Sequence, residues 1–239
     1  MSNGIMVARG DLGVELPFED VPSKQKMDPA FKGSFKKLCR SNRVYIVTGG
    51  LKEHVVEQLG QDVVDLCEEV FECAGNTEGK IDDANLHAYI LNKVENSKFE
   101  HKTANHIDKR TNMWSVSLPG RDSDMEVREL YQVHDLYYNE RLQICQEMEE
   151  MFPEYVATLS GATSLDICKV GHDKSQILDR IPRGDNALYF FGDRTQEWGN
   201  DYTLAQRIIN EGTGLVFTPT HWAETWQWVL DKIREPLGA

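Results

Sequence analysis

Residues 188–201 read LYFFGDRTQEWGND, and this stretch decides the fold that we predict for the chain. Its first four residues are apolar and mostly aromatic, and an apolar run of this length is typical of a buried strand. Gly192 ends the run, and Asp193 follows it directly. In an open parallel sheet, the carboxyl ends of the strands border the crevice in which ligands bind. We therefore expect Asp193 to lie at the ligand-binding edge of such a sheet.

Two further side chains with oxygen ligands, Asn200 and Asp201, follow Asp193 within one loop. Mg²⁺ binds oxygen atoms and is commonly held by one or two carboxylates while it keeps several waters. The stretch therefore predicts a magnesium site on Asp193, Asn200 and Asp201. The alternative is an acidic turn in which Asp201 caps the next helix.

The charge balance limits the kinds of partner that the chain can have. Its 239 residues carry 26 basic and 39 acidic side chains, a net charge of −13. This balance argues against nucleic acid and membrane surfaces as partners, so an anionic substrate would need local arginines, lysines or a cation. No apolar run approaches the roughly 20 residues of a membrane span, and no signal-peptide pattern opens the chain. The five cysteines lack metal-ligand spacing. We expect a cytoplasmic protein with reduced thiols.

Strands and helices alternate at both ends of the chain, which predicts an α/β core with a parallel sheet. The expected strands are residues 5–8, 44–47, 70–73, 188–191 and 215–218. The expected helices are residues 27–40, 53–59, 202–210 and 222–234, with a further helix opened by Lys174. Four residues are expected to pack the final helix onto the sheet: Trp222, Trp226, Trp228 and Val229.

The middle of the chain has a different character. Residues 87–94 and 137–152 have helical patterns, the second with an apolar stripe that includes Cys145, Met148 and Met151. Residues 106–116 alternate in the manner of an antiparallel strand. We predict an α+β cap at residues 81–169, inserted into a core formed by residues 1–80 and 170–239.

Thr48 and Lys174 are the remaining candidates in the core. Thr48 follows a β-branched run and precedes Gly49 and Gly50, so its hydroxyl and nearby backbone N–H groups could hold an anion at a helix start. The alternative is an ordinary strand-to-helix turn. Lys174 is expected near Asp193, where it would steady a nucleophile and screen a transferring phosphoryl group.

The order of Thr48, Lys174, Asp193 and Asp201 resembles the haloacid dehalogenase superfamily of phosphotransferases. More closely, residues 22–235 resemble the eukaryotic-type phosphomannomutases and their phosphosugar-phosphatase relatives. The most specific part is RTNMWSVSLPGR, residues 110–121, followed by Arg128. The resemblance implies a haloacid dehalogenase-like core, Mg²⁺, a hexose phosphate substrate and an aspartyl-phosphate intermediate.

The same resemblance implies roles for several cap residues. Arg110, Arg121 and Arg128 would surround the distal phosphate of the sugar, and the fork of each guanidinium suits that task. The turn SGATSLD, residues 160–166, would hold this phosphate and a sugar hydroxyl, through Ser164 and Asp166. The alternative for the arginines is a solvated face with salt bridges to Glu126 and Glu129. GHDK, residues 171–174, resembles a Gly-Trp-Asp-Lys stretch, with His172 in place of Trp.

The N-terminal segment departs from the family pattern. GIMVARGDLGVE, residues 4–15, and the PFEDVP that follows resemble a strand and loop of pyruvate kinase, but nothing downstream resembles that enzyme's barrel.

The superfamily's first motif is Asp-x-Asp-Gly-Thr. An ungapped match puts Asp11 at the nucleophile, which also binds the metal, and Gly13 at the general acid and base. Another placement of the gap puts Glu15 at the position of the nucleophile and Pro17 at the position of the general acid and base. Leu51 stands where the mutases carry a hydroxyl.

Three hypotheses follow for the function. The first is an Mg²⁺-dependent phosphomannomutase-like enzyme or phosphosugar phosphatase, impaired by the atypical first motif. The second is a relative that binds phosphosugars without turning them over. In the third, the ligand site is vestigial and the cap is the surface of a homodimer.

Overall fold

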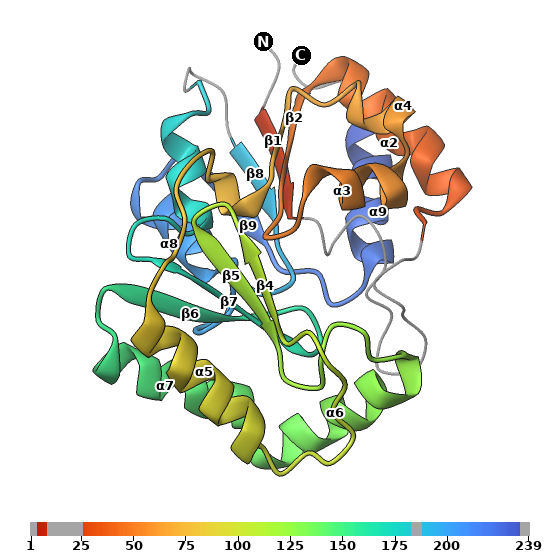
Figure 1. The fold of residues 1–239 in the computed structure, drawn as a ribbon. Helices are drawn as coiled ribbons and strands as arrows, with labels where there is room; N and C mark the ends of the chain where they lie inside the picture. Colours follow the sequence, from red (N-terminus) through yellow and green to blue (C-terminus); the bar gives the residue numbers. More distant parts are fainter. Residues whose placement is uncertain (1–3, 9–25, 183–187, 235–239) are drawn as a thin grey trace.

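The computed structural model describes residues 4–8, 26–182 and 188–234, which form two sheets (Figure 1). The first sheet is parallel and has the strand order β3-β2-β1-β8-β9. The second is antiparallel and has the order β4-β5-β7-β6. The structure thus has the predicted parallel-sheet core with an inserted α+β cap. No helix of the described part is both long and apolar enough to cross a membrane.

The core strands end at a common edge of their sheet. They are β1 (Gly4–Ala8), β2 (Arg43–Val47), β3 (Glu69–Phe71), β8 (Leu188–Phe191) and β9 (Gly214–Phe217). Ala8 lies opposite Val47, and Val7 lies opposite Phe191. Thr48, directly after β2, and Asp193, two residues after β8, therefore come to one edge of the sheet, as the sequence predicted.

Both faces of the core sheet are covered by helices. Val44 and Ile46 of β2 join one apolar cluster with α2 (Pro29–Ser41), α3 (Lys52–Leu59), α4 (Gln61–Val64) and α9 (Trp222–Arg234). Tyr45 and Val47 point to the opposite face, where α8 (Tyr202–Asn210) and the 3₁₀-helix η2 (Lys174–Asp179) pack. Alternate burial on two faces is what a period of two residues produces in a strand.

The final helix packs on the core as expected. Val229 is buried, and Trp222, Trp226 and Trp228 pack against the same cluster as α2. The Phe191 and Trp228 rings lie 4.7 Å apart, centroid to centroid, and Phe31 of α2 lies 5.8 Å from Trp226. Residues near the two ends of the chain thereby share one layer (Figure 1).

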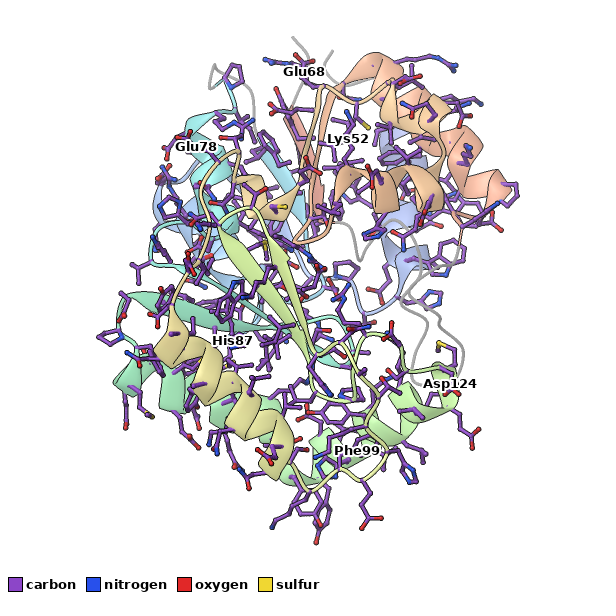
Figure 2. All side chains as sticks on the ribbon, viewed as in Figure 1. Lys52, Glu68, Glu78, His87, Phe99 and Asp124 are labelled. Atoms are coloured by element: carbon purple, nitrogen blue, oxygen red, sulfur yellow. The ribbon has the colours of Figure 1, made fainter. Side chains whose placement is uncertain are left out.

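In the cap, one sheet lies between the core and three helices (Figure 1). Its elements are α5 (Ala84–Asn96), β4 (Ile107–Arg110), β5 (Met113–Ser117), α6 (Met125–Tyr138), α7 (Glu140–Met151), β6 (Tyr155–Ser160) and β7 (Ser164–Lys169). The side chains of His87, Phe99 and Asp124 mark the cap in Figure 2, and those of Lys52 and Glu68 mark the core. We name residues 76–83 the first crossover and residues 170–173 the second crossover between core and cap.

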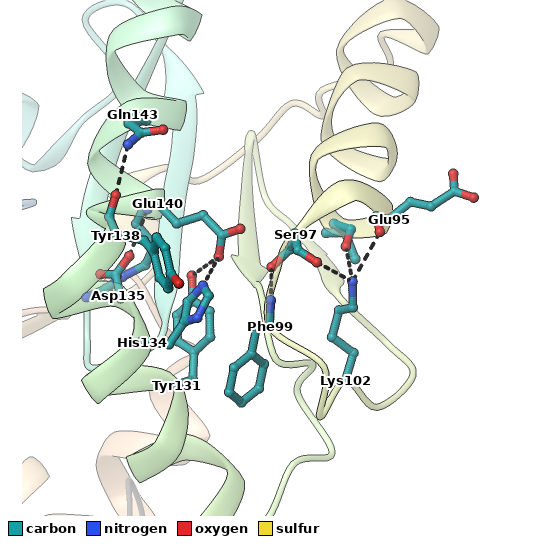
Figure 3. A network of polar contacts seen from close by, with 12 residues as sticks. Glu95, Ser97, Phe99, Lys102, Tyr131, His134, Asp135, Tyr138, Glu140 and Gln143 are labelled. Carbon is teal, nitrogen blue, oxygen red and sulfur yellow. Dashed lines mark hydrogen bonds and ion pairs between the residues drawn. The ribbon is translucent and has the colours of Figure 1, made fainter.

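Polar contacts stabilise the ends of the cap helices (Figure 3). Lys102 Nζ donates hydrogen bonds to three carbonyls at the end of α5, those of Val94, Glu95 and Ser97. Tyr131 of α6 donates to Glu140 Oε2 at the start of α7, at 3.0 Å. The lysine charge also suits the negative end of the α5 dipole.

Several predicted elements need correction. The strand predicted at residues 106–116 is the hairpin β4–β5, because Asn112 takes the left-handed conformation (φ 49°) that reverses the chain. The helix predicted at residues 137–152 is interrupted at Asn139 (φ 50°), which separates α6 from α7. Met151 of the predicted stripe is 60% exposed, and Ile144 is buried instead. Cys73 lies in the 3₁₀ turn η1 (Cys73–Gly75), not in a strand. The domain boundaries at 80/81 and 169/170 stay predictions.

Candidate functional site

Thr48 shapes the turn that follows β2. Its Oγ1 accepts a hydrogen bond from Gly50 N at 2.9 Å, and its carbonyl accepts one from Ala74 N at 2.8 Å. The residue is 3% exposed. Helix α3 begins at Lys52, two residues after Gly50, and the side chain of Leu51 gives it no capping bond. The turn therefore fixes the Thr48 hydroxyl at the carboxyl edge of the sheet.

Lys174 and Asp201 form a buried ion pair. Lys174 Nζ lies 2.6 Å from Asp201 Oδ1, and the two side chains are 7% and 1% exposed. Arg194 N donates to Asp201 Oδ2 at 3.3 Å. Asp201 is the N-cap residue of α8, the position that the helix-cap alternative gave it, but its side chain makes no capping bond. The described contacts of Lys174 pair it with Asp201, and its expected place near Asp193 stays a prediction.

Two opposing effects act on the Asp201 carboxyl. Burial raises its pKa and is the larger effect, and the negative charge of Asp193 adds to it. The Lys174 ammonium acts in the opposite sense. Because Asp193 influences this pKa, the two carboxylates lie within electrostatic range of each other.

Asp193 is the better placed of the two for a cation. The Asp193 side chain is 22% exposed, whereas the Asp201 side chain is 1% exposed and pairs with Lys174. Arg194 Nε lies 3.9 Å from Asp193 Oδ2. Mg²⁺ needs only one or two carboxylates because it keeps waters, so this donor set fits the ion. The described residues contain no group of three His, Cys, Asp or Glu side chains that could hold a metal. Asp11, the fourth predicted ligand, lies outside the described residues.

Asn200 joins the core to the cap. Its Nδ2 donates to Ser160 Oγ at 3.2 Å and to Asp166 Oδ2 at 3.4 Å. Its backbone N–H donates to Leu159 O at 3.1 Å, beside a bridge between Leu159 and Gly199. The Asn200 side chain thus contacts cap residues, while the metal-site prediction grouped it with Asp193 and Asp201.

Two of the three cap arginines converge on one carboxylate. Asp108 Oδ2 lies 2.8 Å from Arg110 Nε and 3.3 Å from Arg121 Nη2. Arg110 Nη1 also donates to Gly49 O of the core at 2.6 Å. This bond places the arginines of the cap beside the loop that carries Thr48.

The side chain of the third arginine, Arg128, stabilises the same region by hydrogen bonds to backbone carbonyls. It donates to Ser123 O at 3.0 Å and to Arg121 O at 2.9 Å. In the described part of the chain the three arginines bond to Asp108, Ser115 and backbone carbonyls, so the salt-bridge alternative through Glu126 and Glu129 is wrong.

The charge around Arg121 favours an anion. Burial lowers the pKa of Arg121, and the positive charge of Arg110 lowers it further. Asp108 opposes both effects. Burial likewise lowers the pKa of Arg128. A guanidinium whose charge is disfavoured in this way would be stabilised by an additional negative group.

Asp166 on β7 is a buried acceptor that points toward the core. It is 6% exposed, and its Oδ1 has no hydrogen-bond partner among the described residues. A Cβ atom on Gly49 would lie only 2.4 Å from Asp166 Oδ2, so the close approach of cap and core requires a glycine at that position. Ser164 lies two residues earlier on the same strand. A buried polar atom without a partner is unusual in a native protein, and a ligand hydroxyl would satisfy it.

Sequence reasoning missed Asp108 and Arg141. Buried Arg141 donates to the carbonyls of Gly161 and Ser164, both at 3.1 Å, and its Nε donates to Asp135 at 2.8 Å. It thereby fixes the turn before Asp166. Asp108 could have been found, because residues i and i+2 of a strand share a face and Asp108 is two before Arg110. Arg141 had no such signal among the many charges of its helix.

A strained turn adjoins Thr48. Cys73, Ala74 and Gly75 all have positive φ, at 48°, 57° and 88°. The left-handed conformation costs about 1–2 kcal/mol for each non-glycine residue. Such strain persists only where the surroundings determine the conformation, and it often marks functional sites.

Comparison with known proteins gives the family. The model of the eukaryotic phosphomannomutase family matches residues 31–219. A phosphomannomutase of Triticum aestivum is 28% identical over 220 residues, which cover 82% of this chain and 88% of the relative. A phosphomannomutase of Saccharomyces cerevisiae is 24% identical over 202 residues, which cover 77% of this chain and 80% of the relative. The N-terminal segment that resembles pyruvate kinase lies outside the family match.

Solved structures share the fold at low sequence identity. IMP-bound Plasmodium falciparum IMP-nucleotidase, truncated at its N-terminus, has a TM-score of 0.59 at 14% identity, covering 98% of this chain and 68% of that one. The C-terminal domain of C. albicans trehalose-6-phosphate phosphatase has a TM-score of 0.58 at 8% identity, and the match covers 95% of this chain and 90% of that one. The fold is therefore the predicted haloacid dehalogenase-like core with a cap, and, with the family match over most of its length, the chain belongs to the eukaryotic phosphomannomutase family.

Proposed function

We propose that this protein binds hexose phosphates between cap and core and transfers their phosphoryl group slowly. The observation that carries the proposal is the bond from Arg110 of the cap to Gly49 O of the core. It brings the cap arginines beside the edge of the core sheet that carries Thr48 and Asp193. A substrate that spans this junction would meet arginines at one end and the core carboxylates at the other.

The cap would supply the distal phosphate site. Arg110, Arg121 and Arg128 would bind the phosphate, which suits the half-buried guanidiniums of Arg121 and Arg128 with their lowered pKa. Asp166 Oδ1, which lacks a partner among the described residues, would accept a hydrogen bond from a sugar hydroxyl. Ser164 would contribute its hydroxyl to the same site.

We expect single replacements of Arg110, Arg121 or Arg128 by Ala to weaken binding of mannose 1-phosphate or glucose 1-phosphate. The loss should be about 1.5–3 kcal/mol each, the contribution of a charge-assisted hydrogen bond. Titration calorimetry would measure it, with the unphosphorylated sugar as the second ligand. Arg43→Ala is the matched control, because Arg43 pairs with Glu68 on the core surface. Equal losses for phosphorylated and unphosphorylated sugar would mean that the arginines are structural.

The core would supply the phosphoryl-transfer site. Mg²⁺ would be held by Asp193, with Asp201 and Asn200 assisting through water, and would neutralise charge on the transferring group. The Asp11 carboxylate would attack phosphorus, the bond to the sugar oxygen would break, and that oxygen would take a proton from water, because Gly13 supplies no acid. Thr48 and the Lys174 ammonium would stabilise charge at the transferring group.

Asp193→Asn should abolish the Mg²⁺ binding isotherm in calorimetry, because an amide oxygen lacks the charge that a hard cation requires. Asp65→Asn, on the surface after α4, is the matched control. An isotherm that survives in Asp193→Asn would remove the metal from this site.

A binding-only relative is the second candidate, and Gly13 favours it because no carboxylate stands two residues after Asp11. Thermal stabilisation by glucose 1-phosphate without turnover would identify this case. A phosphosugar phosphatase would release inorganic phosphate instead of an isomerised sugar phosphate.

The homodimer through the cap also stays a prediction. Helix α6 exposes a row of large apolar side chains, and a second copy of the chain is the occupant we expect there. The row contains Leu130, Val133, Leu136 and Tyr137.

A further inference from the structure

Asn76 brings together three segments that are distant in sequence. Its Nδ2 donates to Cys73 O at 2.7 Å and to His172 O at 2.9 Å. Its Oδ1 lies 3.1 Å from His172 Nδ1 and accepts from Asn112 Nδ2 at 3.4 Å. Asn76 opens the first crossover, His172 lies in the second, and Asn112 lies in the β4–β5 turn of the cap. The residue is 6% exposed, and all four hydrogen-bonding positions of its amide are used.

The left-handed turn before Asn76 links the loops of two candidate catalytic residues. Cys73 N donates to Gly50 O at 3.0 Å, and Ala74 N donates to Thr48 O at 2.8 Å. On the other side, Gln176 Nε2 donates to Ala74 O and Arg180 Nη1 donates to Gly75 O, each at 3.0 Å. Gln176 belongs to η2, which begins at Lys174, and Arg180 follows it directly. The turn therefore spans the space between the Thr48 loop and the element that carries Lys174.

Each carbonyl of this strained turn accepts a hydrogen bond from a side chain. The donor to Cys73 O is Asn76 itself, which also contacts the cap through Asn112. Because a buried amide is costly to leave without partners, the three segments are stabilised together. A cap that moves away from Asn76 would weaken the bonds that hold the turn.

We propose that Asn76 is a positioning residue that couples the placement of the cap to the left-handed turn, and through it to the loops of Thr48 and Lys174. The coupling itself is a property of the ligand-free protein. The effect of this coupling on catalysis rests on the proposed function, which is what assigns catalytic roles to Thr48 and Lys174. Asn76 does not touch the reacting atoms in this assignment.

The test uses two variants with matched controls. Asn76→Asp keeps the shape of the side chain but turns a carboxylate toward the Cys73 and His172 carbonyls. Asn112→Gly removes the hydrogen bond from the cap to Asn76 Oδ1, and glycine keeps the left-handed backbone at φ 49°. The controls are Asn96→Asp, at an exposed amide on α5, and Asn105→Gly, at another left-handed position of the cap (φ 60°).

Hydrogen exchange of the ligand-free proteins, followed by mass spectrometry, measures the coupling. In Asn76→Asp, peptides over residues 72–83 and 169–176 should exchange about tenfold faster, since a lost buried hydrogen bond is worth roughly one decade. Asn112→Gly should show a smaller increase in the same peptides. Peptides from β2 and β5 should keep their rates, and so should both controls. Unchanged rates in Asn76→Asp, or an increase over the whole chain, would overturn the proposal.

A second arm separates this inference from the proposed function. Glucose 1-phosphate should slow exchange over residues 169–176 in the unmodified protein and in Asn105→Gly, but not in Asn76→Asp. Equal protection in Asn76→Asp would contradict the coupling. Protection in none of the proteins would count against hexose phosphate binding, and the ligand-free rates would still decide the role of Asn76.

Discussion

Replacing Lys174 by Met should lower the free energy of unfolding by about 3–5 kcal/mol at neutral pH, the usual cost of removing one partner of a buried ion pair. The large effect is expected because the Asp201 side chain is only 1% exposed and cannot regain water when the ammonium is lost. Urea unfolding without divalent ions would measure it. Lys80→Met is the matched control: Lys80 also pairs with an aspartate, Asp82, but both side chains are exposed, so its stability should hardly change.

The loss in Lys174→Met should also depend on pH. Without Lys174, the described effects that remain are burial and Asp193, which raise the pKa of Asp201, and the Arg194 N–H bond, which lowers it. A carboxyl whose pKa is higher in the folded than in the unfolded protein stabilises the fold at low pH. That stabilisation is lost as the pH rises through the folded pKa. The variant should therefore be closer to the unmodified protein at about pH 5 than at about pH 8. A deficit that does not vary with pH, or no recovery on adding Asp201→Asn, would contradict the ion-pair explanation.

Grafting Asp-Val-Asp-Gly-Thr over residues 11–15 should raise turnover of hexose phosphates by about 10²- to 10⁴-fold. This is the typical contribution of a positioned general acid, which would protonate the leaving sugar oxygen. The control graft is identical except for Asn at position 13, which has the shape of the acid but no proton to give. Release or transfer of phosphate from mannose 1-phosphate would be followed. If the unmodified protein already turns over at about 1–10³ s⁻¹, an ordinary enzyme rate, our interpretation of Gly13 is wrong.

The sequence was most informative where periodicity and position along a strand decide the structure. Helices α8 and α9 have the predicted bounds, because their apolar residues recur on one face that packs on the core. Thr48 and Asp193 were correctly placed at the carboxyl edge of the sheet, since parallel strands bring the residues that follow them together. The family resemblance was confirmed through the match over residues 31–219.

Features that depend on tertiary contacts were not predictable in the same way. The partner of Lys174 is decided by which carboxylate is buried beside it, and spacing along the chain does not contain this information. Asn139 and Asn112 take positive φ where the chain must reverse, yet asparagine occurs in many other conformations. Cys73 and Ala74 hold a conformation that their own side chains disfavour, so contacts distant in sequence explain it. Side chains of Asn76, Gln176 and Arg180 donate to the carbonyls of the turn, and two of its N–H groups donate to the loop that follows β2.

The order of strands has a consequence for synthesis on the ribosome. β1 pairs with β2 on one side and with β8 on the other, so Gly4 meets both Arg43 and Leu188. The cap sheet and its helices are contiguous in sequence, and they emerge before β8 and β9 are made. During that time β1 has an unpaired edge, and α2 lacks the tryptophans of α9 that cover it. An unpaired strand edge is a template for pairing with other chains. The nascent core thus carries an aggregation hazard while the cap is already complete, and the later segments β8 and α9 remove it by covering the edge of β1 and the face of α2.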